Sequence, residues 1–124
     1  MIYLDTYVVV WLYQGDIKRL SPKAISAIEN EDLYISPIVQ LELQYRHQID
    51  RITMGSKHII TDLQAQIGLR ICDLPFAEII EQSIRESGTR DPFDRVIVSH
   101  CRTNETRLTT KDSTIQENFR RCVW

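Results

Sequence analysis

Short apolar runs alternate with helix-start signals along this chain, and that alternation limits the folds open to it. Each run is only a few residues long, which suits buried strands better than helices. We expect four such strands and a candidate fifth, at 1–4, 33–35, 69–72, a run ending at 108–109, and 122–124. Strands that alternate with helices predict an α/β fold with a central parallel sheet of four to five short strands, covered on both faces.

Helices are expected between these strands, and three of them begin at a recognisable signal. In each signal an N-cap residue precedes a proline, which is favoured at the first helical position: Ser21-Pro22, Ser36-Pro37 and Asp91-Pro92. The pattern predicts helices over about 22–31, from 38 to a polar break at 53–56, from there to about 66, from 75 to about 86, and from 92 onward. The segment Val8–Leu12 fits either a strand or a helix. Without a repeat or linker, residues 1–124 are predicted to form one domain.

Charge and cysteine content narrow the class of protein. A net charge of -2 argues against a protein that coats nucleic acid by charge alone, so such contact would need a local basic patch or a metal. The three cysteines lie far apart and form no CxxC pair, which is typical of reduced thiols. The apolar N-terminal run stops at Gly15-Asp16, too short for a membrane span and without a basic leader. We therefore expect a cytoplasmic protein with no membrane partner.

Two aspartates follow predicted strands directly. Asp5 comes after Ile2–Leu4, and Asp112 lies just after Leu108-Thr109. In open parallel sheets the ligand site lies beyond the carboxyl ends of the strands, so both aspartates are candidates for a functional site. Each also fits a structural role, Asp5 as a helix N-cap and Asp112 as a turn or cap residue. Position alone does not decide between these interpretations for Asp5, whereas Asp112 taken alone is better explained as a turn or cap residue.

Three further acids lie on or beside predicted helices. Glu42 is the only charge between Ser36 and Arg46, although one exposed residue on an amphipathic helix would also explain it. Asp91 is best explained as an N-cap. Asp94 falls at the third helical position, where the helix dipole favours an anion, and from there it could also point into the strand-end crevice.

Four motifs occur in a fixed order along the chain: MIYLDT at the N-terminus, then ISPIVQLEL, DPFDRVIVSH and LTTKD. Together they resemble the PIN domain, in particular the toxin ribonucleases of bacterial VapBC-type toxin–antitoxin pairs. Each motif alone is weak, but the four follow the order and spacing of the family over nearly the whole chain. The resemblance implies a PIN-like three-layer α/β/α fold.

The resemblance also assigns roles to residues by position. The acidic site of the family corresponds to Asp5, Glu42, Asp94 and, at its more variable fourth position, Asp112. Asp91 matches a secondary acid found in the branch with the DPFDR motif. Four residues beside these acids are expected to contact the substrate: Thr6, Arg95, Thr110 and Lys111.

Hydrolysis of RNA phosphodiester bonds by activated water is the chemistry that the resemblance implies. A site made only of carboxylate oxygens favours Mg²⁺ or Mn²⁺, which can polarise a phosphoryl oxygen and lower the pKa of a bound water. We expect Asp5 and Asp94 to bind the ion directly, and Glu42 and Asp112 to bind it through water. The family further implies a cognate antitoxin protein and a homodimer. The alternative is a catalytically silent PIN-fold module that binds RNA or protein.

Two residues depart from the family pattern. Tyr7 stands where many relatives have His or Asn, and His100 interrupts a segment that is usually small and apolar. Neither removes a predicted metal ligand. The three histidines show no metal-site spacing, so we expect them to be surface or packing residues. A loose basic region that could form a path for RNA follows the Glu42 helix, at Arg46, His47, Arg51, Lys57 and His58.

Two other phosphoryl-transfer folds also place an aspartate after their first strand. A phosphatase of the haloacid-dehalogenase type needs a second aspartate two residues later, but position 7 is Tyr. A receiver domain needs an acidic pair and a suitably placed lysine, and we find no such set. The sequence therefore favours the nuclease over both.

Overall fold

Five parallel strands form the centre of the computed structural model, which describes residues 1–124. The strands are β1 (Ile2–Leu4), β2 (Leu33–Ile35), β3 (Arg70–Ile71), β4 (Arg107–Thr109) and β5 (Cys122–Val123). Their order across the sheet is β3-β2-β1-β4-β5, so β1 lies in the middle. Tyr3 of β1 pairs with Tyr34 of β2 on one side and with Leu108 of β4 on the other. The predicted parallel sheet is confirmed, with five strands.

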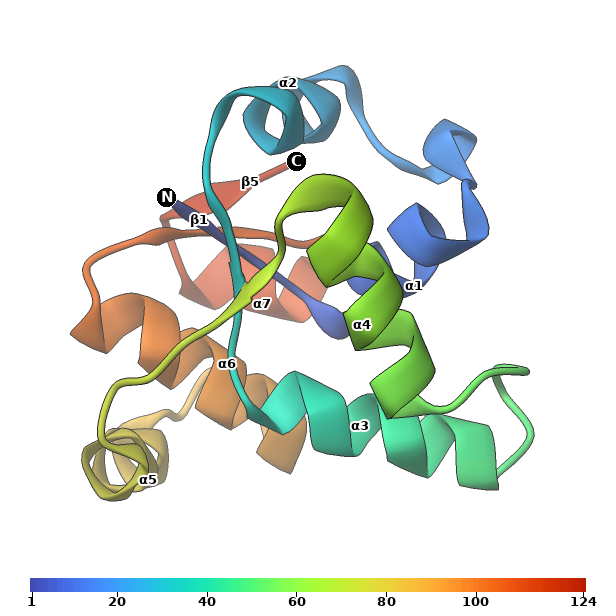
Figure 1. The fold of residues 1–124 in the computed structure, drawn as a ribbon. Coiled ribbons are helices and arrows are strands. Elements are labelled where there is room, and N and C mark those ends of the chain that lie inside the picture. The colour runs from blue at the N-terminus through green and yellow to red at the C-terminus, as the bar shows by residue number, and fades with distance from the viewer.

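Helices cover the sheet on both sides, which gives the predicted three-layer α/β/α arrangement (Figure 1). They are α1 (Thr6–Gln14), α2 (Pro22–Asn30), α3 (Ile38–Gln48), α4 (Ser56–Ile67), α5 (Phe76–Arg85), α6 (Pro92–Thr103) and α7 (Ser113–Asn118), with a short 3-10 turn η1 (Ile17–Arg19). In Figure 1, α2 lies at the top of the molecule, and α3, α6 and α5 lie together at the bottom.

Side-chain caps begin two of the helices where the sequence predicts them. The Ser21 hydroxyl accepts a hydrogen bond from the Ala24 backbone N–H at 3.1 Å, and the Asp91 carboxylate accepts one from the Asp94 backbone N–H at 3.0 Å. Helix α3 begins at Ile38 as expected, but its N-cap is Pro37 rather than Ser36, whose hydroxyl still accepts from the Ile38 N–H at 3.3 Å.

The apolar segment Val8–Leu12, left open by the sequence, is helical because it continues α1 from its cap at Asp5. Gly15 ends this helix in the left-handed conformation at φ 70°, where its N–H donates to the Leu12 carbonyl. The helix therefore begins directly at the carboxyl end of β1.

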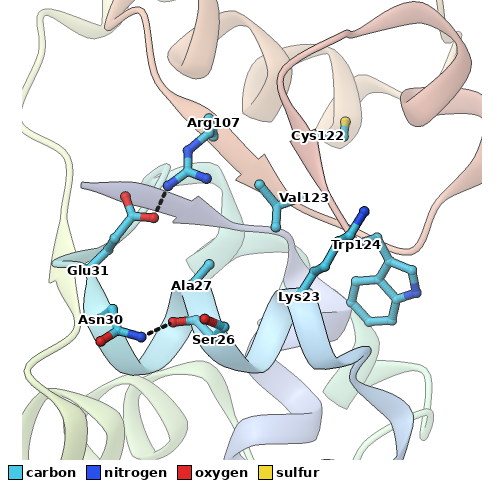
Figure 2. Close-up of a pocket in the computed structure, with 9 residues that line it drawn as sticks. All are labelled: Lys23, Ser26, Ala27, Asn30, Glu31, Arg107, Cys122, Val123 and Trp124. Atoms are coloured by element: carbon cyan, nitrogen blue, oxygen red, sulfur yellow. Dashed lines mark hydrogen bonds and ion pairs between the residues drawn. The ribbon is translucent and has the colours of Figure 1, made fainter.

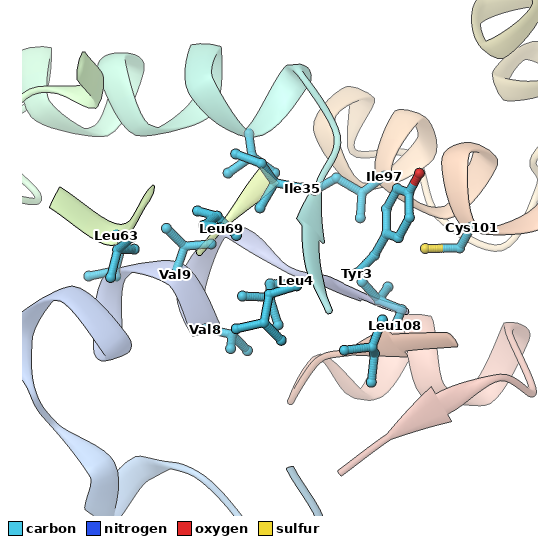
Figure 3. Packing of buried hydrophobic residues seen from close by; sticks show 14 of the residues in the cluster. Tyr3, Leu4, Val8, Val9, Ile35, Leu63, Leu69, Ile97, Cys101 and Leu108 are labelled. Carbon is cyan, nitrogen blue, oxygen red and sulfur yellow. The ribbon is translucent and has the colours of Figure 1, made fainter. Parts of the chain in front are cut away.

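The core lies where β1 meets α1 and α6 (Figure 3). Tyr3 and Leu4 are fully buried, as are Val8 of α1 and Ile97 of α6. His100 is also fully buried, so among the histidines it is a packing residue: its ring stacks on Phe76, and its Nδ1 lies 2.8 Å from the Ser36 hydroxyl. No helix has the length and apolar character that a membrane crossing requires.

Candidate active site

Asp5 lies at the carboxyl end of the central strand and is held there by three contacts. Its backbone N–H donates to the Thr109 carbonyl of β4 at 3.1 Å. One carboxylate oxygen accepts from the Thr6 N–H at 2.7 Å, and the other accepts from the Thr110 hydroxyl at 2.6 Å. Asp5 is thus both the N-cap of α1 and a buried carboxylate, and its two sequence interpretations are compatible.

Glu42 is buried on α3 and bonded to two neighbours. The Thr6 hydroxyl donates to its Oε1 at 2.6 Å, which joins the start of α1 to the middle of α3. The Arg46 guanidinium, one helical turn along, donates to Oε2 from Nη2 at 2.6 Å and from Nε at 3.1 Å. An exposed position for Glu42, the other interpretation of the sequence, is therefore wrong.

Asp94 and Asp112 approach the same region from two helix N-termini. Asp91 caps α6, which leaves Asp94 in the first turn with a carboxylate that accepts no hydrogen bond from the protein. Asp112 is exposed and caps α7 by accepting from the Ile115 N–H at 2.9 Å. The Thr110 hydroxyl that bonds Asp5 also accepts from the Asp112 N–H, at 3.1 Å, and so links the two strand ends.

The carboxylates are close enough to change one another's protonation. Burial raises the pKa of Asp5 from its ordinary 3.8 to about 6, with the Thr110 hydrogen bond acting against the rise and the charge of Glu42 adding to it. Burial also raises the pKa of Asp94, to about 8, and the charge of Asp5 is the next largest cause. Asp91, Glu42 and Asp112 contribute to the rise at Asp94 in the same direction. These acids therefore form one electrostatic cluster.

Comparison with protein families identifies the family of this chain. The model of the PIN domain matches residues 2–120, almost the full length. The chain belongs to the PIN-domain family. No curated protein sequence matches this PIN domain. Membership of this family sets aside the phosphatase and receiver-domain alternatives.

Three solved structures share the fold of this PIN domain at low sequence identity. A toxin–antitoxin complex from Klebsiella pneumoniae is 17% identical, with a TM-score of 0.68 over 100% of this chain and 97% of that one. VapBC2 from Rickettsia felis, bound to a DNA fragment from its promoter, is 18% identical, with a TM-score of 0.64 over 100% of both chains. VapBC-1 from nontypeable Haemophilus influenzae is 19% identical, with a TM-score of 0.55 over 98% of this chain and 92% of that one.

PIN-domain nucleases generally use divalent metal ions, and the donors of this PIN domain fit such an ion in their chemistry. The cluster offers only carboxylate and hydroxyl oxygens, which suit Mg²⁺ or Mn²⁺. Asp94 has an unbonded carboxylate, and its pKa is raised first by burial and then by the negative charge of the neighbouring acids, which a cation would offset. No three Asp, Glu, His or Cys side chains form a ready-made metal group, so the carboxylates would have to draw together around the ion.

The four residues expected to contact substrate differ in their surroundings. Thr6 and Thr110 are buried and donate their hydroxyls to carboxylates, which gives them a positioning contact. The Arg95 Nε donates to the Thr89 carbonyl at 2.8 Å, at the turn before α6. Lys111 is exposed beside Asp112 and makes no ion pair.

Arg46 belongs to the site, although its sequence position suggested only a loose basic region. Its ion pair with Glu42 is four residues apart on α3, a spacing at which opposite charges meet on a helix. That spacing was the available signal. Burial lowers the pKa of Arg46, but its bond to Glu42 outweighs this and raises the pKa above its usual range.

Proposed function

We propose that this PIN domain is a metal-dependent endoribonuclease that serves as the toxin of a toxin–antitoxin pair. The observation that carries the proposal is the electrostatic cluster around Asp5 and Asp94, where burial and mutual repulsion hold both pKa values above their ordinary range. Groups shifted in this way at the carboxyl ends of a parallel sheet are typical of an active site.

Asp5 and Asp94 would hold the ion directly, with Glu42 and Asp112 reaching it through water. A bound Mg²⁺ or Mn²⁺ would supply positive charge that polarises the scissile phosphate and makes water a stronger nucleophile. Thr110 orients Asp5, since its hydroxyl donates to the carboxylate at 2.6 Å.

At the rim, Arg95 and Lys111 flank two of the acids and would bind backbone phosphates. Thr6 lies deeper, between Asp5 and Glu42. Its N–H donates to Asp5 and its hydroxyl donates to Glu42, which fixes the positions of the two carboxylates relative to each other. We infer that its contact with RNA is made through the acids that it positions.

The test is cleavage of RNA by the purified protein with Mg²⁺ or Mn²⁺ and with a chelator. Asp5→Asn is expected to lower cleavage by roughly 100-fold or more, because it removes a charged ligand and keeps the shape. Glu81→Gln removes an exposed acid from α5 and should cleave like the wild type. Mn²⁺ binding, measured by paramagnetic resonance, should weaken in Asp5→Asn but not in Glu81→Gln. Equal cleavage by Asp5→Asn and the wild type would refute the site.

A catalytically silent PIN module that binds RNA or protein is the second candidate. The observation that favours it is the Arg46–Glu42 ion pair, because it already satisfies one of the proposed acids without a metal. The two candidates differ in the same assay: the silent module would bind RNA and leave it intact at every metal concentration.

The toxin role rests on the fold shared with structures of toxin–antitoxin complexes. We expect a cognate antitoxin protein encoded beside this chain, and growth arrest when the chain is expressed alone. The three unpaired cysteines support a reducing compartment, the cytoplasm.

A homodimer is also expected. It is supported by two exposed apolar stripes, one on α5 and one along α3. The stripes are formed by Phe76, Ile80 and Ile84, and by Leu41, Tyr45 and Ile49.

A further inference from the structure

Three aromatic rings form a continuous row that begins beside the acidic cluster. Tyr7 and Trp11 lie one turn apart on α1, with ring centroids 6.0 Å apart and planes inclined by 27°. Trp11 also meets Trp124, which follows β5, at 6.0 Å and 53°. Tyr7 is 46% exposed and the two tryptophans are partly exposed. We call Tyr7, Trp11 and Trp124 the aromatic row.

The row touches the candidate active site at its first ring. The guanidinium carbon of Arg46 lies 4.3 Å from the centroid of the Tyr7 ring, and its Nη1 donates to the Tyr7 hydroxyl at 2.7 Å. The same guanidinium is bonded to Glu42. A strand of RNA with a phosphate at the acids would therefore meet Tyr7 as the first surface beside it.

Positive charge accompanies the row away from the acids. The segment from Asp16 to Lys23 carries three cations, Lys18, Arg19 and Lys23, against the single acid Asp16. The guanidinium carbon of Arg19 lies 5.8 Å from the Trp11 ring. The Arg19 Nε pairs with Asp16 at 2.8 Å, which leaves Lys18 and Lys23 as the surplus cations. A phosphate backbone running beside the rings would meet a local surplus of positive charge on a protein whose net charge is -2.

The far end of the row opens into a pocket between α2 and β5 (Figure 2). Trp124 and Lys23 lie at one end of this pocket, and the Arg107–Glu31 ion pair lies at the other. Glu31, the only acid that lines the pocket, is thus already paired. The pocket therefore again places an aromatic ring, Trp124, near a cation, Lys23.

Trp11 and Trp124 each pack one part of their side chain against the hydrophobic core, but packing does not account for Tyr7. Tyr3, which has a core role, is fully buried, whereas Tyr7 leaves nearly half of its side chain in solvent. Exposed aromatic faces beside cations are the chemistry by which proteins bind single-stranded nucleic acid, because unpaired bases stack on the rings while phosphates meet the cations. A duplex keeps its base faces stacked inside and offers none to the row.

We propose that the aromatic row is a subsite on which unpaired bases of the RNA stack next to the cleaved bond. This proposal rests on the proposed function for its direction, since it takes the acids as the position of the scissile phosphate. Tyr7 is the base-stacking residue closest to that phosphate, and Arg46 holds its ring in place.

The row contains both tryptophans of the chain, so tryptophan fluorescence reports on this surface alone. The experiment titrates the intact protein with a labelled single-stranded oligoribonucleotide in chelator, where the proposed nuclease does not cut. We expect tryptophan quenching together with a rise in the anisotropy of the label. A duplex of the same sequence should produce little of either.

Tyr7→Ala is expected to weaken binding of the single strand by roughly 10-fold, which corresponds to about 1.4 kcal/mol. Tyr7→Phe keeps the ring, loses only the hydroxyl bonded to Arg46, and should bind nearly as the wild type does. The matched control is Tyr13→Ala on the same helix, because the Tyr13 ring meets the edge of His58 at 5.8 Å and lies outside the row. Circular dichroism and thermal melting verify that each variant is folded.

Single strands bound equally well by Tyr7→Ala and by the wild type, without tryptophan quenching, would overturn the subsite. So would a duplex bound as tightly as the single strand and equally sensitive to Tyr7→Ala. Failure of the nuclease proposal looks different: the wild type would not cleave with any metal, yet binding in chelator would still depend on Tyr7.

Discussion

At the scale of single residues, Asp94 is the group with the most to gain from a cation. It is partly buried at the start of α6, accepts no hydrogen bond, and shares its surroundings with other acids. In the metal-free protein it therefore opposes folding whenever it is ionised. Asp5 is shifted in the same direction but less far, since the Thr110 hydroxyl stabilises its charged form.

This imbalance predicts how the stability of the metal-free protein varies with pH. The pKa of Asp94 is about 8 in the folded state, against an ordinary 3.8. Between these values the folded protein binds more protons than the unfolded chain, so the free energy of unfolding falls as pH rises from about 4 to about 8. Asp94→Asn should remove much of this slope and stabilise the protein at pH 8 by on the order of 2 kcal/mol. Urea unfolding in chelator at pH 5 and pH 8 measures both effects.

Glu81→Gln serves as the control, because it removes an exposed acid on α5 and should keep the wild-type slope. A slope that is the same in Asp94→Asn and in the wild type would show that Asp94 titrates normally.

The acids could be predicted from sequence, but their partners could not. Position after a strand indicated Asp5, and the helix-start signal indicated Asp91 and Asp94. The Thr6–Glu42 hydrogen bond joins residues 36 positions apart, and no local pattern encodes it. Whether the cation at Arg46 would turn toward RNA or toward Glu42 depends on how deeply α3 buries Glu42, which only the packed structure determines.

At the scale of elements, the boundaries followed local chemistry where a side chain caps a helix. Ser21 and Asp91 begin α2 and α6 as predicted. The N-cap of α3 is Pro37 rather than Ser36, and the Ser36 hydroxyl contacts both the Ile38 N–H and His100 of α6, a contact between elements that sequence periodicity does not contain. Strand β3 is shorter than predicted, Arg70–Ile71 rather than 69–72, since only those residues pair with β2.

The turn between α5 and α6 depends on a glycine for a packing reason. A β-carbon at Gly88 would lie 2.5 Å from the Cβ of Asn118, at the end of α7. Gly88→Ala should therefore destabilise the protein by roughly 1–3 kcal/mol through overpacking. Asn118→Gly removes the clashing side chain. Gly88→Ala should therefore cost much less stability in the Asn118→Gly background than in the wild type. Thermal melting of the variants measures the effect, and a Gly88→Ala melt equal to that of the wild type would contradict it.

At the scale of the whole molecule, the α5 stripe predicts a partner surface between two copies of the chain. Ile84 is 73% exposed and is the most exposed of the large apolar residues. A glutamate at this most exposed position of the stripe would place a charge inside an apolar interface, so Ile84→Glu should turn the expected dimer into a monomer. Ile17→Glu on η1 is the control, since Ile17 is 48% exposed but outside both stripes. Light scattering with size exclusion gives the mass.

A monomeric wild type at micromolar concentration would contradict the homodimer directly. A dimer that survives Ile84→Glu would instead move the interface away from α5.

The central position of β1 has a consequence for how the protein is made. Asp5 is synthesised well before the residue that orients it, because the hydroxyl that donates to its carboxylate belongs to Thr110, 105 residues later. Its strand also needs β4 as a neighbour before the acids can gather. A nascent chain on the ribosome therefore carries Asp5 early but cannot assemble the proposed site until the segment through Thr110 has been made and folded. Under the proposed function, a nuclease built in this order is inactive until β4 and Thr110 have joined β1.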